Sequence, residues 1–167
     1  EDITITVSAP GSSQLTGSLV APPSAVDLSG EGATDWAHWG LSSGSSFEHR
    51  STGGSQISDI TRIGSVAAKS FGDAPVSYAW SDGTPTVSTG GTTTGIYIKG
   101  LNNGYELTVP ADTTLRTLRV YMGVAGARAR VEASLSDGSS PAYSEVFENR
   151  TGATTRLVTL DYSAASA

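Results

Sequence analysis

The stretch Thr117–Leu135, which reads TLRVYMGVAGARARVEASL, contains two segments in which apolar and polar residues alternate. In residues 117–122 the apolar side chains occupy every second position, and residues 130–135 repeat the pattern. A β-strand with one buried face and one solvated face has this period of two. The stretch therefore predicts strands, and the rest of the chain extends that prediction.

The same alternation runs through most of the chain, and helical periodicity is nearly absent. It recurs in residues 3–7, 26–28, 96–98, 105–109 and 158–162. Turn signals with Asp-Gly or Asn-Gly occur at residues 81–83, 102–104 and 136–138. We expect the turn at 102–104 to join strands at 96–99 and 105–109. Many short strands at this spacing predict an all-β fold, an antiparallel two-sheet sandwich.

The composition fits one small globular domain and excludes several classes of function. The chain has 167 residues, no cysteine and a formal net charge of −6. This length is typical of a single domain, and without cysteine there are no disulfides or thiolate metal ligands. An acidic surface repels phosphate backbones, so we expect no nucleic-acid partner. No apolar run has the length of a membrane span, so we expect none.

Residues 32–40, G-A-T-D-W-A-H-W-G, resemble a poorly characterised bacterial extracellular domain marked by a G-T-x-D-W-x-H-W-G segment. Further segments are similar to the same family, at residues 77–86, 94–98, 107–114 and 133–139. The resemblance covers roughly residues 15–166. It implies a β-sandwich, which we expect to be of jelly-roll type, in a secreted or cell-surface protein. It implies no catalytic role.

One departure from the family pattern concerns the last strand. In similar domains the Ala-Ala-Ser segment is followed by a strand of the type G-Q-T-L-T-V, whereas here the sequence stops at Ala167. A matching strand stands at the other end, in residues 1–7. We therefore predict an N-terminal donor strand at 1–9, a linker at 10–14 and a sandwich domain at 15–167.

An incomplete sandwich exposes unpaired backbone groups and an apolar slot, which an added strand can fill. We expect the side chains of Ile3, Ile5 and Val7 to occupy that slot. Three arrangements stay open: the strand returns to its own domain, it inserts into the next subunit, or the chain is one repeat of a tandem array. The first functional prediction is a structural subunit or repeat of an extracellular filament or adhesive assembly, with copies of itself as partners.

The alternative prediction is a non-catalytic carbohydrate-binding module of a secreted protein. Exposed aromatic rings stack on the apolar faces of sugar rings, and the candidates are Trp36, Trp39, Tyr78 and Trp80. Alternation places Trp36 and His38 on one face of a strand and Trp39 on the other. The competing interpretation is that these rings pack in the core, with their indole N–H groups bonded to the backbone.

Catalytic and metal-binding motifs are nearly absent from the sequence. There are two histidines and no G-x-S-x-G segment, so we expect no enzyme activity, no metal site and no cofactor. A structural calcium ion is the one alternative, because acidic residues stand in or near turns, and the competing interpretation is turn chemistry. The acidic turn residues are Asp27, Glu31, Asp35, Asp73, Asp82, Asp112 and Asp137.

Overall fold

The computed structural model describes residues 13–166, whose regular structure is strand except for one short helix. The predicted all-β class is confirmed, with several small antiparallel sheets. The predicted donor residues Ile3, Ile5 and Val7, and the predicted linker up to residue 12, lie outside the described residues. Gln14, the last residue of that linker, begins the first strand.

The chain forms two compact units. Residues 13–22 and 111–166 make the hairpin unit, and Pro23–Pro110 make the inserted unit. The chain therefore completes one strand of the hairpin unit, builds the whole inserted unit, and then returns. Alternation reports which face of a strand is buried, not which strands are neighbours, so the sequence does not reveal this insertion.

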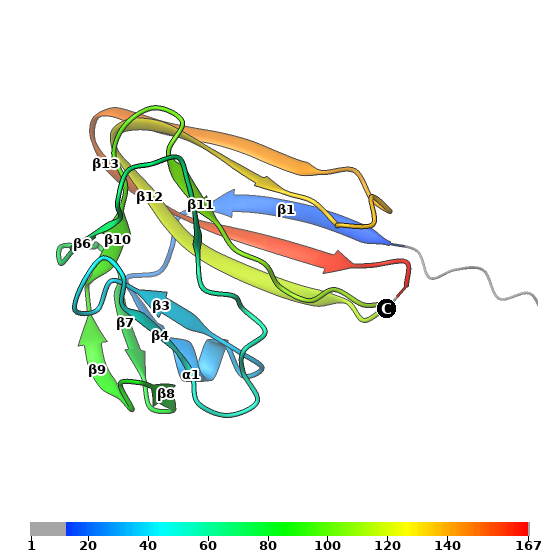
Figure 1. The fold of residues 1–167 in the computed structure, drawn as a ribbon, viewed down its shortest axis with the longest axis horizontal. Coiled ribbons are helices and arrows are strands. Elements are labelled where there is room, and N and C mark those ends of the chain that lie inside the picture. The colour runs from blue at the N-terminus through cyan, green and yellow to red at the C-terminus, as the bar shows by residue number, and fades with distance from the viewer. Residues whose placement is uncertain (1–12, 167) are drawn as a thin grey trace, which may run out of the picture. The chain divides into compact units, whose positions relative to one another are not determined.

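The hairpin unit holds three antiparallel strands in the order β1-β13-β12 (Figure 1). They are β1 (Gln14–Val20), β12 (Arg116–Ala133) and β13 (Tyr143–Ser163). Both alternating segments of the opening stretch fall in or at the end of β12, as predicted. The buried apolar residues of this unit are Val124, Leu135, Phe147, Val158, Leu160, Tyr162 and Ala164.

The β12–β13 ribbon bends sharply at its middle. Its register shifts between Ala125, opposite Ala153, and Ala127, opposite Asn149. Gly126 has a φ of +59°, which glycine adopts without steric cost. The Asn149 side chain accepts hydrogen bonds from the backbone N–H groups of residues 151 and 152 and donates to the Ala153 carbonyl. Residues 150–152 have no opposite residue in the register with β12, and these local bonds take the place of cross-strand hydrogen bonds there.

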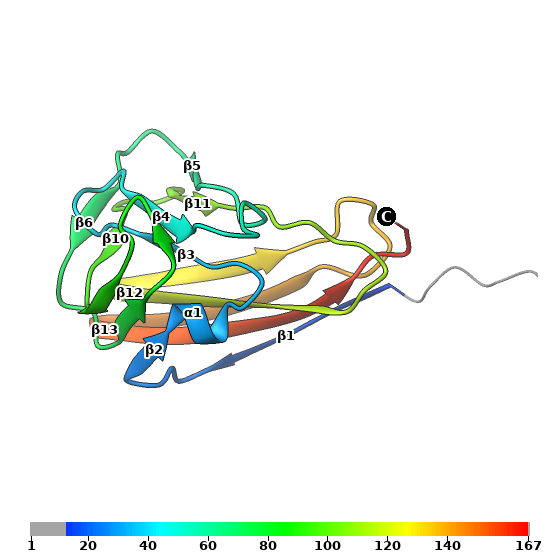
Figure 2. The same ribbon diagram turned by 90° about the horizontal axis from the view of Figure 1, so that it is seen from below.

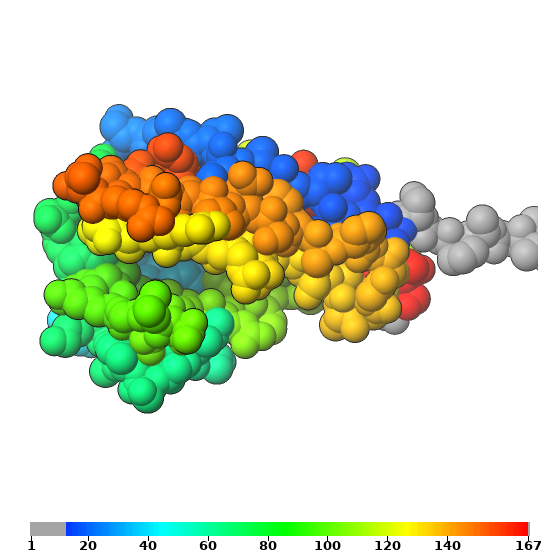
Figure 3. Space-filling view, turned by 90° about the horizontal axis from the view of Figure 1, so that it is seen from above, coloured from blue at the N-terminus to red at the C-terminus, as the bar shows by residue number. Residues whose placement is uncertain are grey.

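The bend divides the hairpin unit into two layers. The ribbon doubles back, so residues 127–133 and 143–149 form a second layer over the sheet that contains β1 (Figure 1). Figure 3 shows the outer face of this second layer, where its yellow and orange segments lie side by side. The layers meet closely, because a Cβ placed on Gly17 would lie 2.5 Å from the Tyr143 ring.

The inserted unit contains four small sheets and the helix α1 (Leu28–Glu31) (Figure 2). One sheet has the order β2-β7-β9, with β2 parallel to β7, and another has the order β3-β4-β8. Two strand pairs, β6–β10 and β5–β11, complete the unit. The strands are β2 (Ala25–Asp27), β3 (Ala37–Trp39), β4 (Phe47–Arg50), β5 (Thr61–Ile63), β6 (Lys69–Phe71), β7 (Ser77–Trp80), β8 (Gly83–Thr84), β9 (Thr89–Thr92), β10 (Gly95–Tyr97) and β11 (Gly104–Glu106).

The turn at Asn102-Asn103-Gly104 is present, but the hairpin predicted around it is wrong. Asn102 has a φ of +59°, the left-handed conformation that asparagine tolerates. The strands on either side have other partners, since β10 pairs with β6 and β11 pairs with β5. A turn signal fixes the local backbone, whereas pairing depends on distant segments that the signal does not report.

Two sheets of the inserted unit pack face to face through aromatic side chains. His38 of β3 lies 5.6 Å from Tyr78 and 5.4 Å from Trp80 of β7, measured between ring centroids. Trp36 lies 5.2 Å from Trp80. Sheet-on-sheet packing of this kind defines a sandwich core. In residues 13–166 no helix is both long and apolar enough to cross a membrane.

Candidate functional site

Strand β3 sends neighbouring side chains to opposite faces of its sheet. His38 is 6% exposed and faces the core, whereas Trp39 faces outward and is half-buried. Trp36, just before the strand, is buried on the side of His38, as its ring contact with Trp80 requires. The predicted division between Trp36 and His38 on one side and Trp39 on the other is confirmed.

Trp36 and Trp80 are core residues, so the expectation that they form an exposed sugar platform is wrong for both. They are 3% and 2% exposed. The Trp36 indole donates to Asp82 Oδ1 at 2.9 Å, and the Trp80 indole donates to the Thr86 carbonyl at 2.9 Å. Their N–H groups are thus satisfied inside the protein, which is how buried indoles are normally accommodated.

Tyr78 also belongs to this packing. Its ring is half-buried against His38. Burial raises the pKa of the Tyr78 hydroxyl to about 12, and the negative charge of Glu31 acts in the same direction. Of the four predicted sugar-binding aromatic residues, Trp39 is therefore the one that points away from the core.

Trp39 is the end of a row of three stacked rings on the outer face. Its ring stacks on Phe47 of β4 with centroids 5.5 Å apart and an angle of 19° between planes. Phe47 stacks in turn on His49, with a centroid distance of 5.0 Å. Phe47 is the cross-strand partner of Trp39, and such pairs stabilise a sheet surface. The row holds one face of the Trp39 indole against the protein.

A hydrogen bond fixes the edge of the Trp39 ring. Its Nε1 donates to Asp59 Oδ1 at 2.7 Å, and the same oxygen accepts from the backbone N–H of Ile60 at 2.7 Å. The hydrogen bond from the Ile60 backbone therefore holds the Asp59 carboxylate in place. With its edge and one face restrained, the indole is preorganised.

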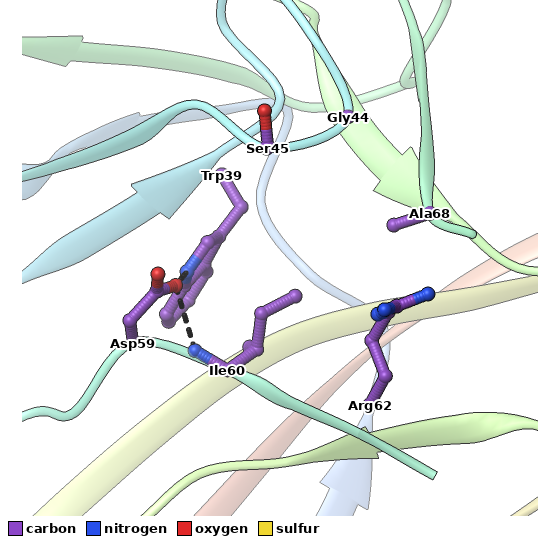
Figure 4. A pocket seen from close by; sticks show the side chains of 7 residues that line it. All are labelled: Trp39, Gly44, Ser45, Asp59, Ile60, Arg62 and Ala68. Atoms are coloured by element: carbon purple, nitrogen blue, oxygen red, sulfur yellow. Dashed lines mark hydrogen bonds between the residues drawn. The ribbon is translucent and has the colours of Figure 1, made fainter. Parts of the chain in front are cut away.

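The indole forms one side of a pocket of about 130 Å³ (Figure 4). The Arg62 and Ala68 side chains lie on the side opposite the indole. The lining residues are Trp39, Gly44, Ser45, Asp59, Ile60, Arg62 and Ala68, and all belong to the inserted unit. A wider hollow continues past Gly44, Ser45, Arg62 and Ala68 to Ala67.

The wall of the pocket depends on the close approach of two backbone segments. A Cβ placed on Gly44 would lie 2.3 Å from the Ala68 carbonyl oxygen and 2.8 Å from the Lys69 Cα. Any side chain at residue 44 would therefore push the segments apart. Glycine at this position brings the loop before β4 against the start of β6.

Comparison with known protein families, curated proteins and solved structures finds no match. The resemblance to a bacterial extracellular domain therefore stays a prediction. What the pocket can do follows from its chemistry: it offers a partly exposed aromatic ring, one carboxylate, one guanidinium and a serine hydroxyl.

Four of the acidic turn residues, Asp27, Asp35, Asp112 and Asp137, accept hydrogen bonds from backbone N–H groups. Asp35 Oδ2 accepts from the backbone N–H groups of Gln56 and Ile57, both at 2.8 Å, and Asp27 Oδ1 accepts from Ser29 N. Asp112 and Asp137 accept from backbone N–H groups two residues on. Within residues 13–166 no group of three or more potential metal ligands gathers.

Sequence reasoning did not identify Phe47, His49, Asp59 or Arg62 as parts of this site. Phe47 and His49 carry a signal, since they alternate around the buried Glu48 and so share a face. Asp59 and Arg62 carry none, because Asp59 lies in a loop and Arg62 in the short strand β5, and no local pattern reports that the chain brings both to the pocket. The stretch between them and β4 is irregular.

Proposed function

We propose that the protein is a non-catalytic carbohydrate-binding module of a secreted or cell-surface protein. The observation that supports this is the Trp39 indole, which is restrained by Phe47 and Asp59 and lines a pocket with polar neighbours. Sugar rings present apolar C–H faces and polar hydroxyl edges. The face of the Trp39 indole complements the apolar C–H face of a sugar, and the nearby Asp59 carboxylate and Arg62 guanidinium complement its hydroxyl groups.

Preorganisation strengthens the case for binding. Ordering a mobile side chain on association costs about 0.5–1.5 kcal/mol. The Trp39 ring is already stacked and hydrogen-bonded, so little of that cost remains. The pocket is small, which favours recognition of one sugar residue or of the end of a chain.

Replacement of Trp39 tests the proposal. Binding of the purified chain to a glycan array, followed by calorimetry on the hits, is expected to be lost in Trp39→Ala and partly kept in Trp39→Phe. Leu101→Ala is the matched control, because Leu101 is 92% exposed in the same unit and does not line the pocket. Equal glycan binding by Trp39→Ala, with an unchanged unfolding midpoint, would overturn the proposal.

The proposed binding needs no cofactor. We expect affinity for a glycan hit to be unchanged after treatment with a chelator. A loss that calcium restores, and that sodium does not, would instead support a structural calcium ion of the kind the acidic turns allow.

A second candidate, a subunit or repeat of an extracellular filament or adhesive assembly, is favoured by the sheet edge at β1. Among the described residues, β1 pairs with β13 alone, so its other edge is open to a further strand. The proposed donor is the segment 1–9, with Ile3, Ile5 and Val7 facing the acceptor. The partner would be a second copy of the chain, and the completed fold would be of jelly-roll type.

Deletion of residues 1–9 separates the two candidates. Strand donation predicts that the deletion abolishes large assemblies seen by light scattering, while glycan affinity is kept. Trp39→Ala should abolish glycan binding and leave the assemblies intact. A monomer at high concentration in the full-length chain would contradict assembly between copies.

A further inference from the structure

We propose that the Trp39 pocket selects acidic sugars, with a sugar carboxylate bound by Arg62. The inference rests on the proposed function and names its ligand class. It is carried by the guanidinium of Arg62, which forms no ion pair among the described residues, and by the division of the pocket into a side with hydrogen-bond acceptors and a side with donors.

Arg62 differs from most of the arginines with assigned partners and is like Arg156, which also bonds only to neutral oxygens among the described residues. Four of them form ion pairs with carboxylates: Arg50, Arg116, Arg130 and Arg150. Within the described residues Arg62 makes a single hydrogen bond, from Nη1 to the Val66 carbonyl at 3.2 Å, and no ion pair. A guanidinium carries five N–H donors, so most of its donors remain open.

The setting makes this cation notable. The chain has a net charge of −6, so its surface is not generally basic, and Arg62 places a positive charge beside the pocket. Its side chain extends to the pocket, on the side opposite the Trp39 indole (Figure 4). A planar guanidinium binds a carboxylate through two parallel hydrogen bonds, a geometry that a neutral hydroxyl does not match.

Asp59 sets the orientation of the ligand. Its Oδ1 is occupied by the Trp39 indole and the Ile60 backbone, while Oδ2 has no partner within residues 13–166. A carboxylate oxygen accepts from hydroxyls and repels another carboxylate. A sugar is therefore expected to turn its hydroxyls toward Asp59, its C–H face toward Trp39 and its carboxylate toward Arg62. Uronic acids carry these three features.

The test compares uronic-acid oligomers with the same oligomers after methyl esterification, which removes the charge and keeps the sugar. The probes are oligomers of glucuronate, galacturonate and mannuronate. For at least one of them we expect the wild-type chain to bind the acid about tenfold more tightly than the ester, a ratio of the size given by one charge-assisted hydrogen bond. High salt should reduce that ratio.

Variants test whether Arg62 is responsible for the preference for the acid over the ester. Arg62→Gln should bind acid and ester equally, and Arg62→Lys should keep part of the preference, because an ammonium retains the charge but does not form the paired contact. Arg128→Gln, which removes the same charge from an exposed position in the hairpin unit, should keep it. Trp39→Ala should lose both ligands.

The outcomes separate this inference from the function beneath it. If neutral glycans or the esters bind as well as the acids, or if Arg62→Gln leaves the ratio unchanged, the acidic-sugar inference is overturned and carbohydrate binding stands. If sulfated sugars bind and carboxylated ones do not, the inference is likewise overturned. If no glycan of any kind binds, the proposed function fails and the inference fails with it.

Discussion

Gly17 of β1 lies against the ring of Tyr143, the first residue of β13, so closely that a Cβ on residue 17 would be 2.5 Å from Cε2. The two residues belong to different layers of the hairpin unit. The contact shows that the second layer folds directly onto the sheet containing β1. The absence of a side chain at residue 17 makes room for the aromatic ring.

Gly17→Ala is expected to destabilise the protein by about 1–3 kcal/mol, the usual cost of overpacking. The Tyr143 ring must rotate or the layers must separate to admit the methyl group. Chemical denaturation followed by circular dichroism measures the change. In a double-mutant cycle with Tyr143→Ala, the cost of the glycine substitution should largely disappear. An unchanged cost in the Tyr143→Ala background would show that the strain comes from elsewhere.

In the hairpin unit the sequence predicts the strands but not the bend that stacks them in two layers. Alternation in residues 117–122 and 130–135 predicts strand at both places, and β12 contains the first segment and residues 130–133 of the second. The bend of the ribbon depends on Gly126 of β12 and on Asn149 of β13, whose side chain bonds to the backbone of residues 151–153, and the two residues are 23 positions apart in the sequence. Local patterns report burial and turn chemistry, whereas pairing partners follow from the whole chain.

The sequence likewise predicts some features of the candidate site and not others. The order Trp36-Ala37-His38-Trp39 already separates an inner from an outer face, and the structure confirms it. Alternation does not report which face a second sheet covers, so the sequence leaves Trp36 and Trp80 as candidates, and the structure shows that both are buried. Arg62 lies in the three-residue strand β5, which follows an irregular segment, and no sequence pattern predicts its place at the pocket.

Asp82 joins Ser29 of α1, Trp36 before β3 and Arg50 of β4, and its removal should destabilise the inserted unit. It accepts hydrogen bonds from the Ser29 hydroxyl and the Trp36 indole, and it pairs with Arg50 at 3.0 Å. Asp82→Ala leaves the buried indole N–H without its partner, an expected loss of about 1–3 kcal/mol in the free energy of unfolding. Asp73→Ala is the control, since Asp73 is exposed and has no assigned partner among the described residues.

The same contacts give Asp82 a role in acid stability. The Ser29 hydroxyl, followed by the Trp36 indole and Arg50, lowers the pKa of Asp82 from its ordinary value of 3.8. A carboxylate with a lowered folded pKa contributes stability above its unfolded pKa and loses it as pH falls through the folded value. Denaturation below about pH 4 should therefore narrow the difference between wild type and Asp82→Ala. A difference that stays constant to pH 2 would contradict the assignment.

His38 makes the protein sensitive to mildly acidic pH. Burial lowers its pKa from 6.5, although the hydrogen bond to the Thr94 carbonyl and the charge of Glu48 oppose the shift. Nε2 lies 3.0 Å from that carbonyl and so carries the proton, while Nδ1 is buried without a partner among the described residues. Below pH 6.5 the unfolded chain takes up a proton that the folded imidazole resists, so stability should fall.

A variant with a single histidine measures this directly. The chain has two histidines, so His49→Asn leaves only His38. Its ring is expected to titrate by NMR with a midpoint below 6.5. The free energy of unfolding should be level from about pH 8 to 7 and decline below that range. The double variant His38→Gln, His49→Asn should lose the decline, and a His38 midpoint at or above 6.5 would refute the prediction.

Gly44 is the last position whose substitution gives a sharp expectation, because the atoms that it approaches belong to the backbone. An alanine Cβ would lie 2.3 Å from the Ala68 carbonyl oxygen, and a backbone cannot rotate away as a side chain can. Gly44→Ala should therefore cost about 1–3 kcal/mol and displace the pocket wall. The indole N–H resonance of Trp39 should shift. Gly90→Ala is the matched control in the same unit, since no atom lies within 4 Å of its Cβ position. Equal unfolding midpoints for the two variants would mean that the wall does not depend on Gly44.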